Sequence, residues 1–327
     1  MAASAAVSGA VFGAAMATAG FHDGSLIVAQ MKLQSWHMLQ AFMVATASSA
    51  IIYCLVERRL HLVIPPRPAS SLGIFASHDG NVIGGALLGV GIVLSGSCPG
   101  ALFAQLAAGG RTACFTLAGA VAGAVIWAGK AGELVRRRQQ KSDPGLGMQG
   151  PHLSRAKGLL LLETTCLAVL ALSVSLAPSI PGGRVNGAVA GLVIGIAQLV
   201  SLLARRSMLG ACGPYREAGA LLRRLICGSR LDTKPGDDGS KMAFGLGAVA
   251  GAWLLLRAAP SLVADAVFEA PPLFATVGGF LMVVGAALAG GCTSGHGISG
   301  ISLLSASSIV TMASVFAAGT TVAALTY

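Results

Sequence analysis

Charged residues are scarce in this chain of 327 residues, where they make up 10% of the sequence. A soluble domain carries about 25% charged residues, so this composition argues against a water-soluble fold. Aromatic residues are also few, at 5%. The seven cysteines form no CxxC pair, which excludes a zinc ribbon and a thioredoxin-like motif. Met-rich and His-rich segments that would collect a soft metal are absent as well.

Long apolar runs are abundant instead, and the mean hydropathy is +0.77. A helix needs roughly 17–25 apolar residues to cross a bilayer, and runs of this length recur along the chain. They lie at 7–28, 37–56, 157–177, 186–203, 242–259, 271–290 and 308–326. We therefore predict an all-α polytopic membrane protein with about nine transmembrane helices.

The net charge of +10 could suggest a nucleic-acid partner, but its distribution argues against one. Basic residues gather in loops between apolar runs, as the positive-inside rule describes. We expect a multi-pass protein of the plasma membrane that contacts lipid and no nucleic acid. The basic loops, which we place in the cytoplasm, are 57–67, 130–157 and 205–241. The loops poor in Lys and Arg, which we place outside, are 21–36, 178–186 and 259–271.

One apolar segment occurs twice. Segments 84–98 (GGALLGVGIVLSGSC) and 278–292 (GGFLMVVGAALAGGC) share eight of fifteen residues, and both end at a cysteine. With the loops assigned as above, the first copy enters the membrane from the cytoplasm and the second from outside. The segments GAVFG at 9–13 and GAVAG at 187–191 are a second echo with opposed directions. This pattern predicts an inverted-topology repeat, as in many transporters.

The repeat predicts three parts of the chain. Residues 1–130 form an N-terminal transmembrane repeat, and residues 156–327 form its inverted copy. The polar, basic linker 131–155 joins them on the cytoplasmic side.

Both copies end where a helix cannot continue undisturbed. Pro99 and Gly100 follow Cys98, and Pro99 suits the first position of a new helix. Gly291 precedes Cys292, and the cap-type residues Thr293 and Ser294 follow it. We expect short re-entrant half-helices that meet near the bilayer midplane, with their N-termini directed at the breaks. Exposed N–H groups and the helix dipole favour an anion there.

The thiols of Cys98 and Cys292 narrow the choice of anion. No Lys or Arg occurs within either break, so a compact divalent oxyanion would find only dipoles and weak donors. A neutral S–H group is a weak donor with a polarisable sulfur. These breaks therefore suit a soft, sulfur-bearing anion.

The motifs GSCPGA and GGCTSGHGISG together resemble the paired signature of the YeeE/YedE family of sulfur-transport-domain proteins, which take up thiosulfate. The resemblance extends over the whole chain, including QMKLQSWHMLQAFM and RRSMLGACGPYREAG. It implies an hourglass of two inverted halves. It also implies that the motif cysteines pass thiosulfate along by S–H···S hydrogen bonds without covalent chemistry, and it implies no cofactor. A cytoplasmic sulfur-handling protein is a possible partner.

This chain departs from the family pattern at one place. Members have a further cysteine near the outer end of the early first half, but residues 1–53 contain none. Phe21-His22-Asp23 occupies the corresponding place. Either His22 or Cys212, in the corresponding region of the second half, could substitute for it.

Two other functions stay open at this point. His296 lies close to the second break, and we expect it to line the anion path there. Alternatively, with Cys98 and Cys292 it would complete a metal-binding set, as in a soft-metal permease. A membrane sulfurtransferase would carry a persulfide on one of the two cysteines. That enzyme would need an activated thiolate, and neither cysteine has a charged neighbour in the sequence. We therefore expect a transporter rather than an enzyme.

Overall fold

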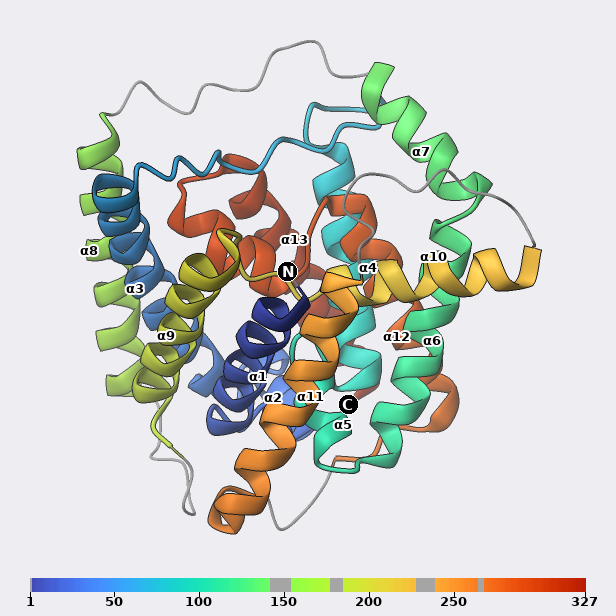
Figure 1. The fold of residues 1–327 in the computed structure, drawn as a ribbon, viewed down its shortest axis with the longest axis horizontal. Helices are drawn as coiled ribbons and strands as arrows, with labels where there is room; N and C mark the ends of the chain where they lie inside the picture. Colours follow the sequence, from blue (N-terminus) through green and yellow to red (C-terminus); the bar gives the residue numbers. More distant parts are fainter. Residues whose placement is uncertain (1, 142–153, 177–184, 228–238, 264–267) are drawn as a thin grey trace.

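The computed structural model describes residues 2–141, 154–176, 185–227, 239–263 and 268–327, and its regular elements in these ranges are all helices (Figure 1). The first half contains α1 (Ala2–Thr18), α2 (Gly24–Met31), α3 (His37–Leu60), α4 (Asp79–Ser95), α5 (Ala101–Ala107), α6 (Arg111–Trp127) and α7 (Lys130–Lys141). The remainder contains α8 (Arg155–Leu176), α9 (Gly187–Arg205), α10 (Gly213–Cys227), α11 (Ser240–Ala258), the 3-10 turn η1 (Pro260–Leu262), α12 (Pro272–Ala289), the π-helical segment η2 (Ser294–Gly300) and α13 (Ala306–Thr326).

Six helices of the described chain are long and apolar enough to cross a membrane: α3, α8, α9, α11, α12 and α13. The pair α6 and α7 adds a seventh if it is counted as one span, although its axes are bent by 63°. Two further apolar helices, α1 and α4, are shorter. The prediction of an all-α multi-pass membrane protein is confirmed, whereas the count of nine is not.

The first apolar run was expected as one span over 7–28, and this expectation is wrong. The run contains two helices, because the chain turns between Thr18 and Gly24. Gly20 takes a positive φ of 76° in this turn, which few other residues tolerate. The Asp23 carboxylate then caps α2 by accepting a hydrogen bond of 2.8 Å from the Ser25 N–H.

Glycines let several helix pairs approach to backbone contact. A Cβ at Gly9 or Gly13 of α1 would lie within 2.0 Å of a carbonyl oxygen of α11. Gly187 and Gly191 of α9 are packed in the same way on the backbone of α3. Small residues allow such close packing of membrane helices, and this packing stabilises them because the hydrophobic effect contributes little to helix association in lipid.

Helices α4 and α12 pack closely on each other with matched contacts. A Cβ at Gly91 would lie 2.5 Å from the Met282 amide nitrogen, and a Cβ at Gly285 would lie 2.5 Å from that of Leu88. Gly91 corresponds to Gly285, and Leu88 to Met282, when Cys98 is aligned with Cys292. The two glycines therefore occupy equivalent places on the two sides of one interface.

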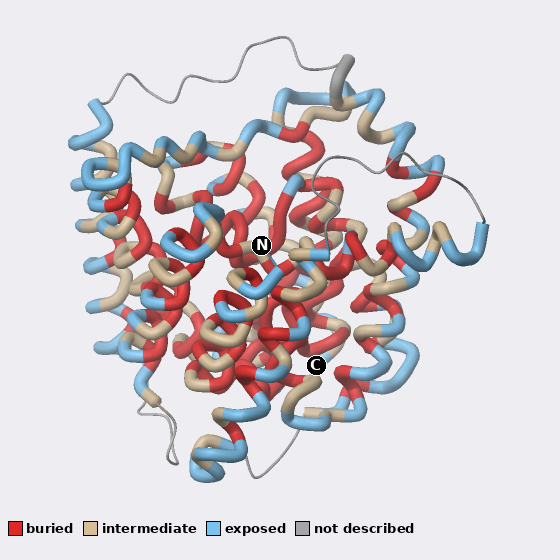
Figure 2. Tube along the Cα trace, in the orientation of Figure 1, coloured by how far each residue is buried: buried red, intermediate tan, exposed pale blue. Residues whose placement is uncertain are grey.

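Buried residues gather in the interior of the bundle, where α1, α4, α5, α11 and α12 contribute to one apolar core, and the peripheral helices are exposed on their outer faces (Figure 2). Helix α8 is the most peripheral span, with 11% of its apolar window buried. The linker expected at 131–155 begins with helix α7, and its residues 142–153 lie outside the described part of the chain.

Candidate functional site

Both breaks form where the sequence predicts them. Helix α4 ends at Gly96 with φ of 58°, and α12 ends at Gly290 with φ of 85°. Helical hydrogen bonding resumes at the cysteines, since the Cys98 carbonyl accepts from the Leu102 N–H at 3.0 Å. The Cys292 carbonyl accepts from the His296 N–H at 2.8 Å. Each cysteine therefore stands at the start of a short helical segment.

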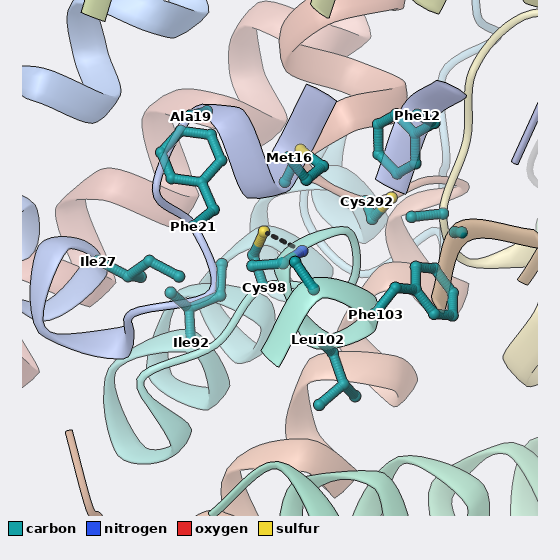
Figure 3. Packing of buried hydrophobic residues seen from close by; sticks show 14 of the residues in the cluster. Phe12, Met16, Ala19, Phe21, Ile27, Ile92, Cys98, Leu102, Phe103 and Cys292 are labelled. Carbon is teal, nitrogen blue, oxygen red and sulfur yellow. Dashed lines mark hydrogen bonds between the residues drawn. The ribbon is translucent and has the colours of Figure 1, made fainter. Parts of the chain in front are cut away.

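Cys98 is buried at the centre of the apolar core (Figure 3). Its Sγ accepts a hydrogen bond of 3.3 Å from the Ala101 N–H, at the start of α5. The thiol also lines a cavity with about 10 Å³ of free space, a volume at the lower limit for one water molecule. The other lining side chains are apolar except Thr293, and three of them are methionines: Met31, Met38 and Met312.

Thr293 was expected to cap the second half-helix, but the structure gives it no capping hydrogen bond. Its side chain instead lines the same cavity as Cys98, although the two residues belong to different breaks. The Thr293 Oγ1 is buried and forms no hydrogen bond of standard geometry within the described chain. The Thr293 side chain lies beside the Cys98 thiol, so the hydroxyl and the thiol can face the same ligand.

Cys292 is fully buried in a more polar setting than Cys98. Its Sγ lies 3.2 Å from the Ser294 hydroxyl and next to the Gly295 N–H. The Cys212 thiol, which precedes α10, is a further neighbour of the Cys292 thiol. All three cysteines are free thiols in the structure.

Pro99 and Gly100 are held from the opposite side by residues that the sequence did not indicate. The Tyr215 hydroxyl of α10 donates a hydrogen bond of 2.8 Å to the Pro99 carbonyl. The Tyr215 ring stacks on Phe103 of α5, with centroids 5.3 Å apart. A Cβ at Gly100 would lie 3.1 Å from the Phe12 ring, so α1 packs directly over this turn. Tyr215 also lies near all three cysteines.

His296 braces the second break through both of its ring nitrogens. The Nδ1 atom lies 2.9 Å from the Ser308 hydroxyl, and Nε2 lies 3.2 Å from the Ala289 carbonyl. A Cβ at Gly291 would meet Nε2 at 2.9 Å, which explains a glycine there. Because both nitrogens are engaged, the hypothetical metal set of Cys98, Cys292 and His296 does not form. The described residues contain no group of three His, Cys, Asp or Glu side chains that could hold a metal.

Arg67 places a positive charge at the second break, although it is far from that break in the sequence. It lies in the loop between α3 and α4, yet its guanidinium Nε donates to the Gly295 carbonyl at 2.7 Å. Nη1 donates to the Gly290 carbonyl at 3.0 Å. The expectation that no cation serves either break is therefore wrong for the second one. The sequence carried no signal, because more than 220 residues separate the partners.

Two comparisons with known proteins bear on the function of this site. A family model described as sulphur transport matches residues 19–322. The chain belongs to this sulphur transport family. A search of curated proteins gave no match.

Membership in the sulphur transport family confirms the resemblance to YeeE/YedE proteins. Family membership makes this chain a transporter of a sulfur compound, and the substrate of such a transporter is a small anion. Membership also favours a transporter over an enzyme.

His22 is one of the two residues that the sequence offers in place of the family's further cysteine. The side chain is buried and lines a second small cavity with Gly96, Gln105 and Phe268. This cavity lies at the first break, because Ser95 and Gly96 line it as well. Cys212, the other candidate, lies instead beside Cys292 at the second break.

Proposed function

We propose that this protein is a permease for thiosulfate and that the neutral thiols of Cys98 and Cys292 relay the anion. The observation that carries the proposal is the equivalence of the two thiols. Each is buried at a helix break, and each has beside it the N–H of the residue three positions further on. Two equivalent thiol sites facing the molecular centre are what a two-step relay requires.

The ligand chemistry of the first break supports a soft anion. Cys98 offers one S–H donor, and the neighbouring cavity is lined by polarisable methionines and the Thr293 hydroxyl. S–H···S hydrogen bonds suit the terminal sulfur of thiosulfate, and Thr293 and the backbone N–H groups suit its oxygens. A relay of hydrogen bonds needs no covalent step and no cofactor.

The second break extends the relay by one thiol. Cys212 lies beside Cys292, so an anion at Cys292 can pass directly to the neighbouring Cys212 thiol. On the side of the first break, His22 takes the place of the missing family cysteine. We infer the order His22, Cys98, Cys292 and Cys212 from outside to inside. Pro99, Gly100, Gly291, Ser294 and His296 shape the two turns without carrying the anion.

We also infer that residues 1–130 and 156–327 are inverted repeats around this centre. The matched contacts of Gly91 and Gly285 across α4 and α12 support this relation. A second support is that α1 packs on α11 as α9 packs on α3. Counting the 17-residue helices α1, α4 and α6 with the six longer ones then gives the nine spans expected from the sequence.

The basic loops set the proposed orientation. Segments 57–67, 130–157 and 205–241 face the cytoplasm of a plasma-membrane protein, so Arg67 and Cys212 lie at the inner mouth. A cytoplasmic sulfur-handling protein would receive the anion there.

Uptake into proteoliposomes tests the permease directly. Radiolabelled thiosulfate should accumulate inside the vesicles, and all label should leave the protein on denaturation. Absence of protein-dependent uptake would reject the proposal. In cells, the gene should allow growth on thiosulfate as sole sulfur source when other sulfate and thiosulfate uptake is missing.

A sulfurtransferase stays the second candidate because of one observation. The Arg67 guanidinium lies at the second break, and a nearby cation stabilises a thiolate. In such an enzyme the Cys292 thiolate would attack the outer sulfur of thiosulfate, break its S–S bond and release sulfite. Label on the outer sulfur would then stay on Cys292 as a persulfide after denaturation, and a reducing thiol would release it.

A further inference from the structure

The last glycine carbonyl before each break accepts a hydrogen bond, but the donor differs between the two breaks. At the end of α4, the Gly96 carbonyl accepts a hydrogen bond of 2.9 Å from the neutral amide of Gln105. At the end of α12, the equivalent Gly290 carbonyl accepts from the Arg67 guanidinium at 3.0 Å. Phe268 also packs on Gly96, since a Cβ there would lie 2.4 Å from its ring. The first break is therefore closed by neutral groups and the second by a cation.

Arg67 spans the second break. Its Nη1 and Nε bind the carbonyls of Gly290 and Gly295, which flank Cys292 on both sides in the sequence. Added Cβ atoms at Gly291 and Gly295 would each lie within 2.9 Å of the guanidinium nitrogens. The glycines of the GGCTSG motif thus leave room for this side chain as well as for the turn.

Arg67 lies in the loop of residues 61–78, which we call the strap. Hydrogen bonds hold this loop against the helices next to the second break. The Arg67 carbonyl accepts hydrogen bonds of 3.0 Å from the hydroxyls of both Ser305 and Ser307. Ser70 donates to the Leu288 carbonyl at 2.7 Å and accepts from Gln139 of α7 at 2.8 Å. The backbone of the strap is therefore fixed, whereas the guanidinium hydrogen-bonds two neutral carbonyls within the described part of the chain.

The guanidinium has no carboxylate partner among the ion pairs of the described chain. Charge-assisted hydrogen bonds to an oxyanion are roughly twice as strong as neutral ones, and the planar fork of Arg fits two oxygens at once. An oxyanion that reaches Cys292 therefore competes well with the two carbonyls.

We propose that Arg67 recognises the oxygen end of the transported anion at the inner mouth. Between the passage of one anion and the next, its hydrogen bonds to the Gly290 and Gly295 carbonyls, which we call the clamp, hold the second break closed. This inference rests on the proposed permease function. The thiols bind the sulfur end and Arg67 binds the oxygens, so the substrate must be a sulfur anion with at least two oxygen atoms. Hydrosulfide, which has no oxygen, is not a substrate of this arrangement.

The test uses Arg67→Gln and Arg67→Lys in the full chain, with Arg59→Gln as the matched control on an exposed arginine of α3. Arg67→Gln should raise the KM for thiosulfate by about tenfold or more and change kcat less, because it removes a charged hydrogen-bond donor. Arg67→Lys keeps the charge but cannot bridge both carbonyls, so it should recover part of the KM. Arg59→Gln should resemble the unmodified protein.

A second measurement does not depend on transport. A membrane-impermeant maleimide is applied from the inner face without substrate, and labelling of Cys292 is followed by mass spectrometry. Both Arg67 variants should label faster than the unmodified protein, because the clamp is open. If Arg67→Gln does not fold, Arg67→Lys decides both measurements.

The outcomes separate this inference from the proposed function. Normal KM and normal Cys292 labelling in the Arg67 variants would overturn the clamp, even if the unmodified protein transports thiosulfate. Faster labelling of the variants, with no thiosulfate uptake by the unmodified protein, would support the clamp and reject the permease.

Discussion

The two breaks share a backbone plan but differ in what surrounds the thiol. Cys98 lies among methionines and apolar side chains and shares its cavity with Thr293. Cys292 lies among Ser294, Cys212 and the Arg67 clamp. An unpaired oxyanion is costly in an apolar place and cheaper beside a cation. This difference suggests that Cys98 is a brief transit point and Cys292 is the stronger binding site.

The largest effect is expected at the stronger site. Cys292→Ala removes the thiol that Ser294 and Cys212 face, so thiosulfate uptake into proteoliposomes should fall to background. Thermal unfolding should show that the variant is folded. Uptake at the unmodified rate would reject the thiol pathway.

Cys98→Ala should have a severe but smaller effect. The Thr293 hydroxyl and the Ala101 N–H remain to contact the anion, so the loss corresponds to one hydrogen bond to a charged ligand, about 10- to 100-fold in uptake rate. The comparison is contradicted if Cys98→Ala is more damaging than Cys292→Ala under the same conditions.

Substituting serine for either cysteine tests whether transport needs a polarisable sulfur atom or only a hydrogen-bond donor. Cys98→Ser and Cys292→Ser keep a donor of similar size but replace the polarisable sulfur with oxygen. We expect a several-fold loss of uptake at both sites, and a larger loss at the apolar Cys98 site, where dispersion contributes more. Full activity of Cys292→Ser would indicate simple anion binding at that break.

Thr293→Val should reduce uptake by about tenfold, since it removes a buried hydroxyl that lies beside the Cys98 thiol. Thr293→Ser is the matched control and should retain most activity, because it keeps the hydroxyl. If the valine variant transports normally, Thr293 does not touch the anion.

The smallest effects test the symmetry of the scaffold. Gly91→Ala and Gly285→Ala each force a Cβ to within 2.5 Å of the opposite backbone, so each should lower stability by about 1–3 kcal/mol. Gly210→Ala is the control, because no atom lies within 4 Å of its added Cβ. Thermal unfolding in detergent measures all three. A neutral result for one of the matched pair alone would contradict an equivalent packing of α4 and α12.

The repeated segment made much of the centre predictable from the sequence. Glycines before Cys98 and Cys292 predicted both breaks, because backbone with positive φ ends a helix wherever it occurs. The apolar runs predicted most spans to within a few residues. The first run misled because Gly20 and Asp23, which divide it, are only two positions in a long apolar stretch.

The missed residues are those brought in from distant segments. Arg67 and Tyr215 reach the breaks from a loop and from α10, and no local pattern in the sequence marks either contact. The role of Thr293 was mistaken because a cap and a cavity-lining hydroxyl have the same local sequence. The orientation of such a side chain is decided by tertiary packing.

Protection of the two thiols by substrate tests the central claim most directly. A membrane-permeant maleimide is applied with and without thiosulfate, and labelling of Cys98, Cys292 and the exposed Cys114 is measured by mass spectrometry. The account predicts that thiosulfate slows labelling of Cys98 and Cys292 over one concentration range and leaves Cys114 unchanged. Equal labelling of both buried thiols with and without thiosulfate, in protein that reacts at these positions, would contradict it.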